Sequence, residues 1–172
     1  SIGHSGFIAK TDLPRAYQLG ATFEMSPYLW TPSAIADEIV QEVGTERAER
    51  AWPVREAIDA RALVVAGSDW AVVPSVNPWI GIETLVSREQ VGGSEKSFGK
   101  SQAISVLEAL DLFTVNAAKH MNTEDRFGRI AEGMVADLIV IDRNPLEVPV
   151  SEIHETQVIL TMIEGEVVYQ QN

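Results

Sequence analysis

The segment that most constrains the fold is the apolar run of residues 62–66, Ala-Leu-Val-Val-Ala. It lacks the polar alternation of a strand with one wet face, so it predicts a strand that is buried on both faces. Such strands are typical of parallel sheets that carry helices on both sides. The run leads into Gly67, Ser68 and Asp69, so an acidic side chain is expected directly after the carboxyl end of this strand.

Strand and helix patterns alternate over the first 125 residues, which predicts a parallel α/β layer. A short strand is predicted over residues 21–25. Thr31 and Ser101 are expected to cap helices, and Pro53 is expected to break one. The predicted helices cover residues 12–19, 32–43, 46–62, 80–89, 101–110 and 114–120.

The pattern changes after Arg126 to short strands. Residues 136–141 predict one strand, and residues 158–163 and 166–169 predict a hairpin that turns at Glu164-Gly165. We therefore predict two units, residues 1–125 and residues 126–172, the second being a small β unit.

The chain carries 25 acidic and 13 basic residues, for a formal net charge of −12. Such a surface repels nucleic acids and anionic lipid, so neither is expected as a partner. The sequence has no apolar run of about 18 residues, so we expect no membrane-spanning helix. There are no cysteines, so any metal must be held by His, Asp or Glu. The lack of cysteine and of a signal-peptide pattern in the first residues fits a cytoplasmic protein.

An ordered series of segments resembles the amidohydrolase superfamily, and most closely amidohydrolase family 3, the group of YtcJ-like metal-dependent hydrolases. The segments are residues 67–70 (GSDW), 77–82 (NPWIGI), 107–110 (LEAL), 114–118 (TVNAA), 127–133, 136–142 (ADLIVID) and the hairpin of residues 161–169. The resemblance covers most of the chain.

The resemblance implies an α/β fold in which a (β/α)8 TIM-type barrel carries a small β-sandwich built from both chain ends. By analogy, His4 ends strand six, residues 21–25 form strand seven and residues 63–66 form strand eight. The expected fold is thus the C-terminal part of a barrel (strands 6–8) followed by strands of a composite β-sandwich.

The resemblance also implies a divalent metal, most often zinc, with one or two ions at the mouth of the barrel. Of the family's ligand positions, only the histidine after strand six and the aspartate after strand eight have counterparts here, at His4 and Asp69. Asp69 is expected to bind metal and to act as general base toward metal-activated water in the hydrolysis of a C–N bond, such as that of an amide or formamide. His4 is expected to bind metal or to polarise the substrate carbonyl, although Gly3 stands where the family often has Glu.

Other candidates carry weaker expectations. Trp70 and Trp79 follow predicted strand ends and are expected either to wall a substrate pocket or to pack under a loop. His120 should end a helix of an outer ring and His154 should lie in the β tail, so both are predicted to be surface residues. The alternation around Glu24 does not decide which face it takes.

Counting ligands and strands predicts that this chain is an incomplete, inactive fragment. A catalytic zinc takes three protein ligands and a complete barrel takes eight strands, whereas two ligands and three strands are expected here. The chain should pair with a missing N-terminal half or self-associate. An alternative is a non-catalytic truncated module that folds by oligomerising. Another is an α/β binding protein whose Gly67-Ser68-Asp69 turn cradles phosphate, which the lack of a nearby Lys or Arg disfavours.

Overall fold

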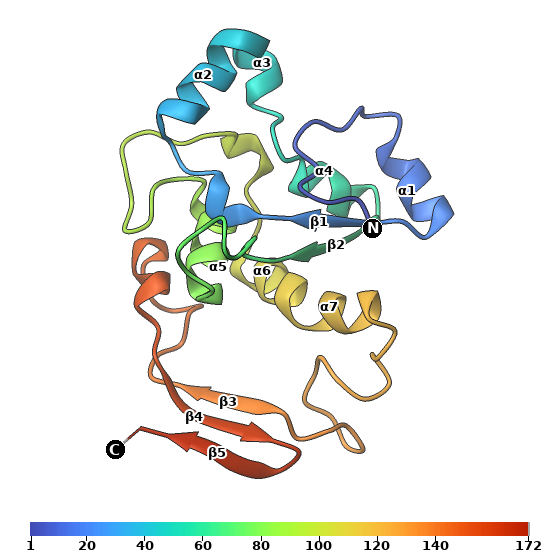
Figure 1. Ribbon diagram of the computed structural model, residues 1–172, viewed down its shortest axis with the longest axis vertical. Helices are drawn as coiled ribbons and strands as arrows, with labels where there is room; N and C mark the ends of the chain where they lie inside the picture. Colours follow the sequence, from blue (N-terminus) through green and yellow to red (C-terminus); the bar gives the residue numbers. More distant parts are fainter. Residues whose placement is uncertain (172) are drawn as a thin grey trace.

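Two parallel strands lie at the centre of the larger part of the molecule (Figure 1). The computed structural model describes residues 1–171, and in it β1 (Thr22–Met25) pairs with β2 (Leu63–Ala66) so that Met25 lies opposite Ala66. On the other side of β1, Ile2 forms an isolated parallel bridge with Phe23. The two strands predicted from residues 21–25 and 62–66 are confirmed. The strand expected to end at His4 is represented by this bridge alone.

The two faces of β1 have different surroundings. Phe23 and Met25 are 2% and 1% exposed and pack in the main core with Val64. Burying a side chain of this size stabilises a fold by about 1.5–3 kcal/mol. Thr22 and Glu24 alternate with them, so their side chains leave the opposite face of the sheet.

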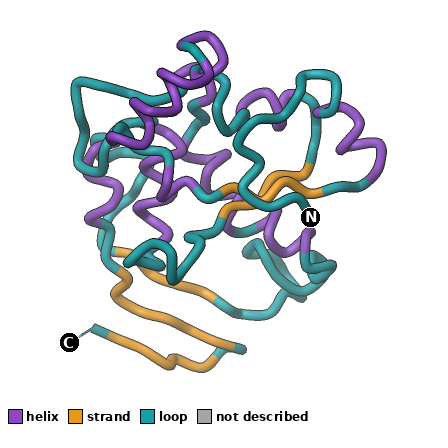
Figure 2. The backbone as a smooth tube through the Cα atoms, turned by 45° about the horizontal axis from the view of Figure 1, so that its top comes forward, coloured by secondary structure: helices purple, strands orange, loops and turns teal. Residues whose placement is uncertain are grey.

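Helices surround the strand pair, and several of the loops that join them are long (Figure 2). They are α1 (Leu13–Leu19), α2 (Ala34–Val43), α3 (Thr45–Ala48), α4 (Val54–Asp59), α5 (Pro78–Ser87), α6 (Val106–Phe113) and α7 (Val115–His120), with 3-10 turns η1 (Pro27–Leu29) and η2 (Lys100–Gln102). The architecture is therefore α/β. None of the helices in the described part of the chain is long and apolar enough to cross a membrane.

Two predicted helix starts were wrong, because a better cap lies further along the chain. Ser33, not Thr31, caps α2, and its Oγ accepts a hydrogen bond from the Ala36 amide. Ser105, not Ser101, caps α6, where Ser105 and Glu108 form a capping box. The Ser105 hydroxyl accepts from the Glu108 amide, and the Glu108 carboxylate accepts from the Ser105 amide, so each side chain satisfies an N–H that the helix leaves unpaired.

Helix α5 is the buried helix of the fold. Its side chains include Trp79, 5% exposed, and Leu85, fully buried. A Cβ at Gly81 would lie 2.9 Å from atoms of Phe113 and Tyr28, so only glycine allows this close packing. The Tyr28 hydroxyl donates to the carbonyl of the residue that caps α5, Asn77, and burial raises the pKa of Tyr28 to about 12.

A buried cation closes the C-terminal end of α5. Arg88 is fully buried, and its guanidinium donates to the carbonyl oxygens of Phe98 and Ala51 at 3.0 and 2.9 Å. The same group lies 4.7 Å from the centre of the Trp30 ring, a cation–π contact. Burial lowers the pKa of Arg88 to about 9. Arg88 thus holds three loop segments around the end of one helix.

The C-terminal residues form a second, antiparallel sheet (Figure 1). Its order is β3 (Leu138–Ile141), β4 (Val158–Ile163) and β5 (Glu166–Gln170), and the 3-10 turn η3 (Val150–Glu155) lies between β3 and β4. The hairpin predicted around Glu164-Gly165 is confirmed. Apolar side chains of this sheet are about half exposed, among them Ile139, Val140, Ile163, Val167, Val168 and Tyr169.

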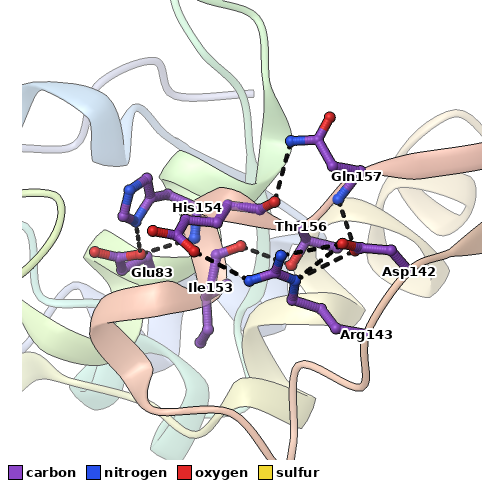
Figure 3. A network of polar contacts seen from close by, with 8 residues as sticks. Glu83, Asp142, Arg143, Ile153, His154, Thr156 and Gln157 are labelled. Carbon is purple, nitrogen blue, oxygen red and sulfur yellow. Dashed lines mark hydrogen bonds and ion pairs between the residues drawn. The ribbon is translucent and has the colours of Figure 1, made fainter.

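A buried carboxylate connects this tail to the helices (Figure 3). Glu83 of α5 is fully buried; its Oε1 accepts from the Gly92 amide at 2.7 Å, and its Oε2 accepts from both the amide and Nδ1 of His154 at 2.8 Å. The neighbouring Ile153 is fully buried in the main core. The prediction that His154 is a surface residue was therefore wrong, because η3 folds back onto α5.

We expect Glu83→Gln to lower the free energy of unfolding by about 2 kcal/mol, because a neutral amide weakens three hydrogen bonds to a buried charged acceptor. Urea unfolding followed by circular dichroism measures this loss. Glu38→Gln, on the exposed face of α2, is the matched control and should change stability by less than about 0.5 kcal/mol. Equal effects of the two substitutions would contradict the role given to Glu83.

Candidate active site

The carboxyl ends of the parallel segments open into one cavity of about 280 Å³. His4 lies two residues beyond the Ile2 bridge, Ser26 directly follows β1, and Asp69 follows β2 after Gly67 and Ser68. All three line the cavity, so the structure brings the two predicted site residues, His4 and Asp69, to the same hollow. The lining consists of Gly3, His4, Glu24, Met25, Ser26, Val65, Ala66, Gly67, Asp69 and His120.

The imidazole of His4 is oriented by Ser26, the first residue after β1. Its Nδ1 lies 3.3 Å from Oγ of Ser26, and Ser26 is 8% exposed. When the Ser26 hydroxyl donates to Nδ1, the ring proton is carried by Nε2. Ser5 fixes the same loop from the other side, since its hydroxyl donates to the carbonyl of Ile2 at 2.9 Å.

Asp69 is positioned by a tight turn and keeps its carboxylate free. The Gly67 amide donates to the Met25 carbonyl at 2.9 Å, which carries the strand pairing one residue beyond β2. Asp69 itself has a φ of 62°, a left-handed conformation that Asp adopts more readily than most residues. No hydrogen bond or ion pair within residues 1–171 uses its carboxylate. The group is thus available to a ligand or a reacting water.

His120 was wrongly predicted to lie away from this site. Its Nδ1 lies 3.2 Å from Oγ1 of Thr22, and its Nε2 lies 3.4 Å from Oε1 of Glu24. Helix α7 runs along the free edge of β2, where Asn116 Nδ2 donates to the Val64 carbonyl at 3.0 Å. Asn116 and His120 are four residues apart, so they share one helix face, and this spacing was the available sequence signal.

The two tryptophans predicted to wall a pocket lie in different places. Trp70 follows Asp69 directly and is 69% exposed. Trp79 is 5% exposed and belongs to the main core, where its amide bonds to the side chain of Asn77. The structure therefore leaves only Trp70 accessible beside the cavity.

The residues present do not complete a metal site. Within residues 1–171, no three His, Asp, Glu or Cys side chains are placed to hold one ion. His4 and Asp69 supply the donor types that zinc accepts, but a catalytic zinc takes three protein ligands. Further ligands would have to come from outside these residues.

A larger hollow of about 520 Å³ lies between α7 and β3, and its character is different. It is lined mainly by apolar side chains such as Phe113, Met121 and Ile130, and no histidine of residues 1–171 lines it. The smaller cavity, where imidazole and carboxylate groups converge, is therefore the candidate site.

Ligands of α/β proteins characteristically bind beyond the carboxyl ends of parallel strands, and the cavity lies at that edge. The fold and site thus define an α/β protein with a carboxyl-edge site of imidazole and carboxylate groups. The sequence profile of the Amidohydrolase family matches residues 1–169, and the chain belongs to this family.

Individual relatives agree with this assignment. The amidohydrolase-family protein YtcJ of Bacillus subtilis is 29% identical over 164 residues, which are 93% of this chain and 29% of that protein. The N-substituted formamide deformylase of Arthrobacter pascens is 31% identical over 122 residues, 69% of this chain and 21% of that protein. The chain therefore spans less than a third of the length of these relatives.

A solved structure is similar in fold as well. An uncharacterized metal-dependent hydrolase from Pyrococcus horikoshii superposes with a TM-score of 0.70 at 25% identity, over 86% of this chain and 29% of that one. The described residues thus fold like part of a larger hydrolase.

The left-handed backbone conformation of Asp69 determines how substitutions at this position should change stability. In the left-handed conformation, Asp69→Ala should cost about 1 kcal/mol more than Asp69→Gly, because the alanine Cβ meets the following carbonyl oxygen. Asp69→Asn should stay within about 0.5 kcal/mol of the parent, since Asn tolerates this conformation. Thermal unfolding of the three variants measures the order, and an alanine variant as stable as the glycine variant would contradict it.

Proposed function

We propose that this chain carries part of the active site of a metal-dependent hydrolase that acts on C–N bonds of small molecules. The observation that carries the proposal is the convergence of His4 and the free carboxylate of Asp69 on one cavity at the carboxyl edge of parallel strands. The Ile2 segment, β1 and β2 would then be strands six to eight of a barrel, and β3 to β5 would be part of a β-sandwich.

The proposed role of Asp69 is that of general base and then acid. It takes a proton from the attacking water as the C–O bond forms, and returns it to nitrogen as the C–N bond breaks. When Ser26 donates to Nδ1 of His4, Nε2–H is available as a donor toward the carbonyl oxygen; in the other tautomer Nδ1–H faces Ser26 and the unprotonated Nε2 can bind metal. Trp70 is proposed to contact the substituents of the substrate.

The proposed cofactor is a divalent metal, with zinc the best match to a donor set of imidazole and carboxylate groups. The similar hydrolase from Pyrococcus is metal-dependent by name, which supports a metal in this family member. His4 and Asp69 would provide two ligands of one or two ions. The formamide deformylase among the relatives supports amides and formamides as the substrate class.

The proposed site is incomplete in these residues, so we propose that this chain is inactive alone. Its partner would be the missing half of the barrel or a second copy of the chain. The half-exposed apolar side chains of β5, Val167 and Val168, and the open outer edge of that strand are surfaces such a partner would cover. The second candidate, a non-catalytic module that oligomerises, is favoured because residues 1–171 do not supply a third metal ligand.

Metal binding and turnover test this proposal together. The 172-residue chain should retain less than one equivalent of zinc after dialysis and should not hydrolyse N-substituted formamides. If the reading frame extends upstream, its full product should bind stoichiometric metal and turn over. In that product Asp69→Asn should lower kcat by roughly 100-fold or more. His4→Ala should lower the metal content, measured by mass spectrometry.

Two outcomes would overturn the proposal. Tight, stoichiometric zinc and turnover by the 172-residue chain alone would refute its incompleteness. A full-length product that retains metal and full activity without His4 and Asp69 would refute the site. A defined oligomer without metal or activity, also in the longer product, would favour the non-catalytic module.

A further inference from the structure

We propose that Glu24 is a second functional carboxylate of this cavity, which binds a protonated amine or N–H group of the ligand. The class of ligand rests on the proposed function, since cleavage of a C–N bond releases an amine that is protonated at neutral pH. The placement of Glu24 is independent of that function.

Strand geometry directs Glu24 into the cavity. Its neighbours Phe23 and Met25 are buried in the core, so Glu24 leaves the other face of β1. Thr22 confirms the face, because it alternates with Phe23 and contacts the same imidazole, that of His120, as Glu24 does. The carboxylate is consequently part of the cavity wall, along with His4 and Asp69.

One oxygen of this carboxylate is held and the other is free. Oε1 lies 3.4 Å from Nε2 of His120. Oε2 has no hydrogen-bond partner within residues 1–171, and a Cβ built on Gly3 would lie 4.0 Å from it. The free oxygen is therefore near the backbone that leads into His4. His120 thus orients one oxygen of the carboxylate and the other oxygen stays accessible, which suits a ligand-binding group.

Comparison with Glu83 separates this role from a structural one. Glu83 is fully buried, and its oxygens accept three N–H hydrogen bonds, so most of its acceptor sites are used and a ligand cannot reach it. The Glu24 side chain is 44% exposed and touches a single donor. A carboxylate that merely stabilised the fold would be expected to satisfy more of its acceptor sites.

The charges that face the cavity favour a cation. The ionisable side chains lining it within the described residues are two carboxylates, Glu24 and Asp69, and two imidazoles, His4 and His120, with no Lys or Arg. The two carboxylates meet no fixed positive charge in this lining, and such an arrangement concentrates cations. A charge-assisted hydrogen bond from an ammonium to a carboxylate is about twice as strong as a neutral one. Glu24 can thus hold the amine while Asp69 stays free for proton transfer.

The test uses n-butylammonium as the probe and n-butanol as its uncharged counterpart. Titration of the 15N-labelled chain, followed by amide NMR, should show the ammonium perturbing residues around Gly3, Ser26 and Gly67. Glu24→Gln should raise its Kd by roughly tenfold, as expected for loss of a hydrogen bond to a charged group. Butanol should bind more weakly and be insensitive to this substitution. Glu42→Gln, on exposed α2, is the matched control and should leave the ammonium Kd unchanged.

Further variants separate the possible results. His120→Gln should keep ammonium binding within about threefold of the parent, since the charge of Glu24 remains. A loss as large as that of Glu24→Gln would make Glu24 a structural partner of His120 and overturn the proposal. Ammonium binding that is lost in Asp69→Asn but kept in Glu24→Gln would overturn it too, as would no binding at all. Zinc content of the longer product and of its His4→Ala variant tests the proposed function separately, so failure of one does not imply failure of the other.

Discussion

The parallel pairing of β1 with β2 is the constraint on which the candidate site depends. Because Met25 lies opposite Ala66, the loops that begin at Ser26 and Gly67 leave the sheet at the same level. The Ile2 bridge aligns a third segment, so His4 emerges at this edge also. A slip of one residue in β1 would exchange its two faces, which would place Glu24 in the core and Phe23 in the cavity. The apolar packing of Phe23 and Met25 therefore fixes the polar site.

Local signals in the sequence were sufficient for most elements. The uninterrupted apolar run predicted β2, Gly20 marked the end of α1 in its left-handed conformation, and Glu164-Gly165 marked the hairpin. Each of these is decided within a few residues. The missed cap of α6 was also local, because Ser105 and Glu108 have the spacing of a capping box.

The candidate site was predictable only in part, for a physical reason. Asp69 follows a recognisable buried strand, so its edge of the sheet could be inferred from sequence. The contact between His120 and Glu24 depends on how α7 returns along the edge of β2, which no local pattern specifies. Likewise, the position of His154 is decided by a buried carboxylate 71 residues earlier in the chain. Contacts between distant segments had to be seen in three dimensions.

The Glu83 carboxylate accepts three hydrogen bonds, and this limits how such chains can be shortened or recombined. A chain that ended before His154 would leave a dehydrated anion inside α5 with one remaining donor, the Gly92 amide. The other end of the same helix is held by the hydrogen bond from Tyr28 to the carbonyl of its cap, Asn77, which ends the loop that follows Asp69. The C-terminal segment that contains η3 is thus tied to α5. Its exchange between homologues would succeed only if position 83 and its hydrogen-bond donors were exchanged as a set.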